Sequence, residues 1–161
     1  MKKKSKILIY AAIVLCALFA LTGVPYFDKI FSTSTYTKVV ESNWGINLPR
    51  NGAKEVYSFS EPSFHGDGIR YHVIDYPIGN ESKRIANSVF QLEKVFLGAS
   101  KPTEEQVAYV EALLAETEIP QDEIPIWNEC VLVSQSHEDG SELYLFYGSV
   151  TGTVYVVESF L

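Results

Sequence analysis

The feature that most constrains this chain is an uninterrupted apolar run over residues 7–24, which contains no charged residue and follows four lysines within the first six positions. Crossing a bilayer core takes about 20 apolar residues, and the run reaches that length when it is extended through Phe27. We therefore interpret 7–27 as a transmembrane anchor. Residues 1–6 then form a basic cytoplasmic tail, and residues 28–161 form an extracytoplasmic domain.

Two other interpretations of the run compete with a retained anchor. A cleaved signal peptide shares the basic start, but its apolar region is about 7–15 residues long and ends in a small-residue exit. Here the best exit, Leu18-Phe19-Ala20, begins with a bulky residue and the apolar run continues past it. A buried core helix fits the preceding lysines least well, and a lipid-modified Cys16 is set aside because Leu15 precedes it. Lysines concentrated before the run place the N-terminus inside in both export interpretations.

The part of the chain after the anchor has the composition of one folded domain. It is 134 residues long, and the whole chain is 47% hydrophobic and 13% aromatic, which is too apolar for a disordered stalk. The two cysteines, Cys16 and Cys130, are divided between the anchor and the domain, so the domain contains no internal disulfide. An exported domain without disulfides favours a bacterial envelope over a small eukaryotic secreted scaffold.

Charge is distributed unevenly along the domain. Lys101 is the last basic residue, and residues 102–161 contain twelve acidic residues and no lysine or arginine. The simplest interpretation is a solvated acidic face that keeps the domain soluble. A basic protein partner and divalent cations are the alternatives. Nucleic acid is disfavoured as a partner, because phosphate binding needs clustered lysine and arginine.

Three segments have apolar residues at helical spacing, which predicts helices over 34–44, 83–97 and 103–116. Gly45 and Gly98 are natural ends for the first two. The third opens with a capping box, in which Thr103 and Gln106 satisfy each other's backbone N–H groups. The proline-containing stretch 118–127 then predicts a connecting loop.

Before these last two helices, the sequence predicts a β-hairpin. Two β-rich runs, 54–60 and 69–76, flank the turn-forming stretch 61–68. Alternation along the second run places His72 beside Arg70, on the more polar of its two faces.

The last third of the domain predicts a meander of three strands, over 129–135, 142–147 and 153–160. The segment 143–147 is apolar on both faces, so it should be covered on both sides or against a partner. We therefore expect an α+β fold behind a single N-terminal transmembrane helix. Its antiparallel sheet combines the N-terminal hairpin with the C-terminal meander, the two amphipathic helices lie between them in the chain, and helices cover a face of the sheet.

Two turns that contain a histidine and a carboxylate are the most site-like segments. His65 and Asp67 alternate with glycines in the first, and His137 begins the second. Together with His72 they could supply ligands for a divalent ion or a small molecule if the turns met. A tight glycine turn is the favoured interpretation of the first, and neither turn has a recognised metal-ligand spacing. We therefore assign no metal, cofactor or catalytic residue.

We expect a membrane-anchored extracytoplasmic protein-binding module, such as an inhibitor, an immunity-type protein or an accessory subunit, and not an enzyme. An acidic surface with aromatic anchors suits contact with a basic protein. The candidate partner surface consists of Trp127, Glu138, Asp139 and Glu142. The alternative is a small-molecule or divalent-cation domain, with or without enzymatic activity, that uses His65, Asp67, His72 and His137.

Overall fold

The computed structural model describes residues 36–61, 67–76, 91–115 and 117–161, all within one compact unit that spans residues 33–161. The predicted tail and anchor, His65 and most of the predicted helix 83–97 lie outside the described residues. None of the helices in the described ranges is long and apolar enough to cross a membrane.

The described residues form an α+β fold around one five-stranded antiparallel sheet. The strands are β1 (Lys54–Ser60), β2 (Gly68–Asp75), β3 (Cys130–Ser136), β4 (Glu142–Gly148) and β5 (Thr153–Phe160), and their order across the sheet is β1-β2-β5-β4-β3. The predicted hairpin is β1–β2 and the predicted meander is β3–β4–β5. The two join because β5 pairs with β2 along its whole length, with Arg70 opposite Glu158. The strand boundaries differ from the predicted ones by a residue at most.

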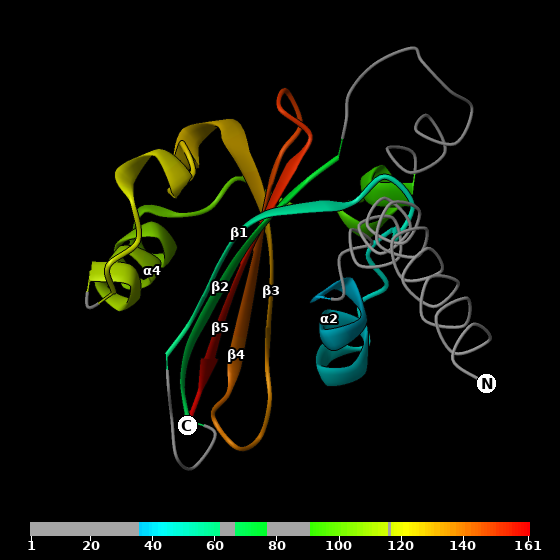
Figure 1. Cartoon of the computed structure of the whole chain (residues 1–161). Helices are drawn as coiled ribbons and strands as arrows, with labels where there is room; N and C mark the ends of the chain where they lie inside the picture. The colour runs from blue at the N-terminus through cyan, green and yellow to red at the C-terminus, as the bar shows by residue number, and fades with distance from the viewer. Residues whose placement is uncertain (1–35, 62–66, 77–90, 116) are drawn as a thin grey trace, which may run out of the picture. The chain divides into compact units, whose positions relative to one another are not determined.

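Helices lie on both faces of this sheet. Figure 1 views the sheet along its edge, with α2 (Tyr36–Trp44) on one side and α4 (Glu104–Ala115) on the other. Residues 91–95 are helical and belong to the α2 side, since Leu92 is buried in the same core cluster as α2. Our expectation of helices on a face was therefore incomplete, because the helices divide between the two faces.

Local sequence signals set the helix ends. The capping box of α4 forms as predicted: Gln106 Oε1 accepts a hydrogen bond from the Thr103 backbone N–H, and Thr103 Oγ1 accepts one from the Gln106 N–H. Gly45 ends α2 with a φ of 68°, a left-handed conformation that glycine adopts at little cost.

Each face of the sheet has its own core, and β4 contributes to both. On the α2 side, Leu143 and Leu145 pack with Val40 of the helix. On the α4 side, Phe146 packs with Val110 of α4. Each of these five side chains is fully buried. The prediction that the apolar segment 143–147 is covered on both sides is confirmed.

Between α4 and β3 the chain crosses one end of the sheet as a loop with two short 3₁₀ helices, η1 (Gln121–Glu123) and η2 (Trp127–Glu129). The predicted connecting loop is therefore present, and two turns of 3₁₀ helix stiffen it. We call residues 117–129 the crossing loop.

Candidate functional site

A groove lies between α4 and the crossing loop, and it encloses about 670 Å³. That volume is within the range of pockets that hold small ligands or parts of a partner protein. The groove is lined by Glu111, Leu114, Ala115, Thr117, Ile119, Gln121, Ile124, Pro125, Ile126, Trp127 and Asn128. The stretch 118–127 was predicted as a loop, but a groove against α4 was not predicted.

Hydrogen bonds tie the crossing loop to the helix and to the sheet. The Trp127 indole Nε1 donates to Glu111 Oε1 of α4 at 2.8 Å, and its ring packs edge-on against Phe146 of β4 with a centroid distance of 4.8 Å. In the middle of the loop, the Glu123 backbone carbonyl accepts a hydrogen bond from the Tyr71 hydroxyl of β2 at 2.5 Å. The loop is therefore held both to α4 and to the sheet, and the groove that it lines is preformed.

Exposed apolar side chains lie at the groove. Ile126 is 62% exposed, and it also lines a second small hollow together with Val150, which is 80% exposed. Exposed apolar side chains of this size are common singly, but here two line the same small hollow beside the groove. Their exposure is consistent with a binding surface.

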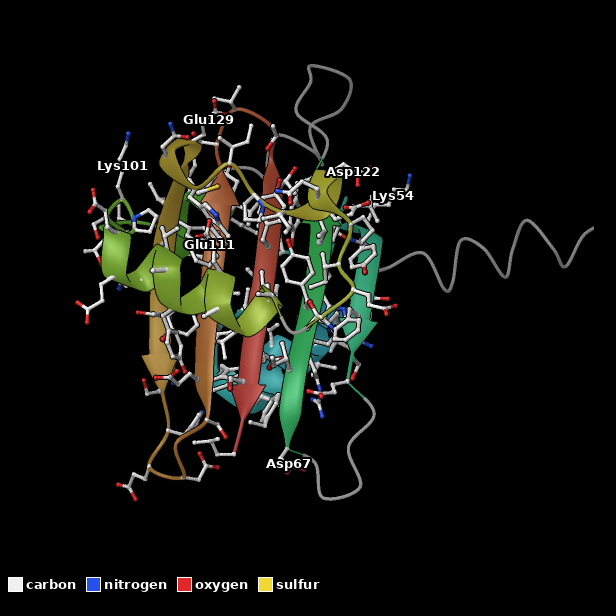
Figure 2. The ribbon with its side chains drawn as sticks, turned by 90° about the vertical axis from the view of Figure 1, so that its left-hand side faces the viewer. Lys54, Asp67, Lys101, Glu111, Asp122 and Glu129 are labelled. Atoms are coloured by element: carbon white, nitrogen blue, oxygen red, sulfur yellow. The ribbon has the colours of Figure 1, made fainter. Side chains whose placement is uncertain are left out.

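Carboxylates surround this apolar surface. Figure 2 faces α4 and shows Glu111 on the helix with Asp122 and Glu129 at the end of the sheet that the crossing loop covers. Lys101 and Lys54 are labelled at the two sides of the same view. Within the described residues the ion pairs are Arg50 with Glu41 and His72 with Glu55, so Glu111, Asp122 and Glu129 are not neutralised by a salt bridge there.

A second polar feature lies beneath α2. Glu158 of β5 is fully buried, and its Oε1 accepts hydrogen bonds from the Trp44 indole at 2.5 Å and from the Asn43 amide at 3.4 Å. Its Oε2 has no hydrogen-bond partner among the described residues. Arg70 lies opposite Glu158 in the sheet, but its guanidinium stacks over the Phe160 ring instead. Burial without a cation raises the pKa of the Glu158 carboxyl from 4.5 to about 7.

His72 also lies under α2, on the face of β2 that the alternation predicted, but this face is covered and not open to solvent. The side chain is buried because Tyr36 of α2 stacks on its ring. Its Nδ1 lies 2.7 Å from Glu55 Oε1, and since a carboxylate only accepts, Nδ1 carries the hydrogen. Burial lowers the pKa of His72 below 6.5, against the opposing effect of Glu55. The imidazole is thereby held in its neutral form as part of the packing.

The other residues of the predicted histidine site are partly brought together. The turns that contain Asp67 and His137 lie at the same end of the sheet, on either side of the end of β5, because Gly68 pairs with Phe160 and Glu142 with Ser159. Asp67 is exposed there, as Figure 2 shows.

His137 packs against Trp44 with a ring-centroid distance of 4.4 Å, and it lines with Asp139 a hollow of about 210 Å³. His72 pairs with Val156 in the sheet, four residues into β2 from Gly68, which is about 13 Å along the strand. The structure therefore separates His72 from the two turns.

The predicted partner surface is divided between the two ends of β3. Trp127 precedes the strand and lines the groove, whereas Glu138 and Asp139 lie in the turn that follows it. Asp139 accepts a hydrogen bond from the Ser141 N–H, and Glu142 accepts one from the Tyr144 hydroxyl. Of these four residues, Trp127 alone belongs to the groove.

No group of three or more histidine, cysteine or acidic side chains in the described ranges is placed to hold a metal ion. Cys130 is buried, and burial raises the pKa of its thiol to about 11, so the thiolate that a nucleophile requires is disfavoured. No protein-family model, no curated protein and no solved structure matches the chain.

Proposed function

We propose that this protein is a membrane-tethered, extracytoplasmic protein-binding module, and that its partner is a basic protein that contacts the α4 side of the domain. The observation that carries the proposal is the combination of exposed apolar side chains and unneutralised carboxylates around a preformed groove. Protein interfaces combine an apolar centre with a polar rim in this way, and complementary charge selects the partner.

The uneven charge of the sequence supports a basic partner over a neutral one. All residues of α4, the crossing loop and the meander belong to the segment 102–161, which contains no lysine or arginine. A surface whose central elements contain carboxylates and no cation repels another acidic surface and attracts a basic one, over a distance of about 10 Å at 0.1 M salt.

Tethering follows from the apolar run over 7–27 and the lysines before it. An N-terminus inside the cell and a domain outside it would present the α4 side to proteins of the envelope or of the exterior. We therefore place the proposed partner on the outer side of the membrane.

The test is affinity capture with the full chain in neutral detergent, from cells that express it naturally. Two variants of equal charge are compared: Asp122→Asn with Glu129→Gln, beside the groove, and Glu93→Gln with Glu138→Gln, elsewhere on the surface. All four side chains are exposed, so the substitutions should leave the fold intact.

We expect a basic protein to be captured at low salt and lost at high salt, as screening requires. The variant beside the groove should capture less of it, and the control variant should capture as much as the wild type. Capture of no basic protein, or equal loss in both variants, would contradict the proposal.

A further inference from the structure

We infer that the groove between α4 and the crossing loop seats an apolar side chain of a partner's peptide segment, and that a lysine or arginine beside that side chain pairs with Glu111. This inference rests on the proposed function and adds to it the position and the chemistry of the contact. It concerns residues 111–115 and 117–128 and the neighbouring Val150.

The apolar part of the inference follows from the lining of the groove. Leu114 of α4 and Ile119, Ile124 and Ile126 of the crossing loop all line it. Since Ile126 is 62% exposed, an apolar side chain that covers it removes apolar surface from water on both partners, which favours binding. The groove therefore favours an apolar anchor over a polar one.

The cationic part follows from Glu111. Its Oε1 accepts the Trp127 indole hydrogen bond, so the carboxylate is held against the groove wall and is not free to turn away. No basic side chain lines the groove, and no ion pair within the described residues involves Glu111. A lysine or arginine next to the anchor can reach this fixed carboxylate and form a charge-assisted hydrogen bond.

Charge also selects the occupant. A second copy of this domain would bring its own acidic α4 side, since residues 102–161 contain no cation. A peptide segment of a basic protein supplies the anchor and the cation together. The exposed apolar surface continues from the groove past Ile126 to Val150. This surface extends beyond the groove, so a peptide segment of several residues can contact more of it than a small ligand can.

The test measures peptide binding by fluorescence anisotropy, with the full chain in neutral-lipid nanodiscs. The probe is a labelled, end-capped peptide with two leucines between pairs of lysines. Two control peptides are matched to the probe. In one, serines replace the two leucines, and in the other, glutamates replace the lysines. The probe should bind measurably, and each matched peptide should bind at least tenfold more weakly.

Variants of the chain locate the contact. Glu111→Gln keeps an oxygen acceptor for Trp127 and removes the charge, so it should weaken the probe about threefold to fivefold, as expected for a partly exposed ion pair. Glu105→Gln on the same helix lies outside the groove and should bind like the wild type. Ile126→Arg should weaken binding at least tenfold, whereas Leu97→Arg, at a position that is 84% exposed, should not.

Absent binding, equal binding of the three peptides, or equal effects of Ile126→Arg and Leu97→Arg would overturn the inference. Concentration-dependent self-association that Ile126→Arg abolishes would identify a second copy as the occupant and also overturn it. If the captured basic protein still depends on Asp122 and Glu129 but is retained by Ile126→Arg, the groove inference fails while the proposed function stands.

Discussion

Replacing Glu158 by glutamine should remove most of the pH dependence of stability that arises beneath α2. The wild-type carboxyl is fully buried, its Oε1 accepts from Trp44, and its Oε2 has no partner among the described residues. An ionised carboxylate in this position lacks a cation to offset its lost hydration, whereas the protonated form does not carry that cost. Glutamine keeps an oxygen acceptor for the Trp44 indole and cannot ionise.

The magnitude follows from the pKa of Glu158. Burial raises it from 4.5 to about 7, so the folded state binds a proton more readily than the unfolded state does between these values. The stabilisation is fully present below pH 4.5 and is lost as the pH rises through about 7. A difference of this size between the two pKa values corresponds to roughly 3 kcal/mol in the free energy of unfolding.

The assay is urea unfolding of wild type and Glu158→Gln at several values between pH 4.5 and 8, with the full chain in neutral detergent. Tryptophan fluorescence reports on the transition, since both tryptophans of the chain, Trp44 and Trp127, belong to the domain. The stability of the variant relative to wild type should increase by roughly 3 kcal/mol across this range. If the free energy of unfolding of the two proteins depended on pH in the same way, the argument that no cation offsets the lost hydration of the ionised Glu158 carboxylate would be refuted.

Three further predictions concern other parts of the molecule. Burial lowers the pKa of His72, so the contribution of its neutral side chain to stability is present above pH 6.5 and is lost as the pH falls below that value. In the Glu158→Gln variant, the free energy of unfolding should therefore decrease when the pH is lowered below 6.5. Adding His72→Phe to this variant should make that decrease smaller. Thr103→Ala should lower the free energy of unfolding in urea by about 1 kcal/mol, because it removes the side-chain cap of α4. Thr103→Ser keeps the hydroxyl and should lower it only slightly. An equal decrease in both variants would exclude the cap as the cause. Protease added to intact cells should degrade the domain if the N-terminus lies inside, so protection would contradict the proposed topology, while release of the domain into the medium would indicate cleavage.

Local patterns were sufficient to predict the sheet. Period-two alternation and glycine turns placed all five strands within a residue, and the apolar segment 143–147 indicated a strand covered on both faces. The pairing of β2 with β5 and the division of the helices between the two faces are non-local. They depend on which apolar stripe meets which face, and separate helix and strand patterns do not specify that choice.

The sequence contains a signal for the buried carboxyl of Glu158. Alternation along β5 puts Val154, Val156 and Glu158 on one face, so an acidic residue occupies a position that the pattern marks as core. The burial of His72 had no such signal, because the pattern of β2 alone does not show that Tyr36 covers the imidazole.

The groove had no comparable signal. It arises because the Tyr71 hydroxyl binds the Glu123 carbonyl, 52 positions away in the chain, and because the Trp127 indole binds Glu111. Proline residues predicted a loop in this stretch, but the position of a loop over a sheet is determined by such distant contacts. The acidic composition after Lys101 predicted the character of the surface without its shape.

The most direct test of the central claim, that the α4 side of the domain binds a protein partner outside the membrane, is photo-crosslinking in intact cells. A photoreactive residue is placed at position 126 of the full chain, and in a control chain at position 97, since Ile126 and Leu97 are both exposed and Ile126 alone lines the groove. We predict one discrete adduct with another protein from position 126, weaker when the salt in the medium is raised, and no such adduct from position 97. An absent adduct at position 126, or the same adduct from both positions, would contradict the claim.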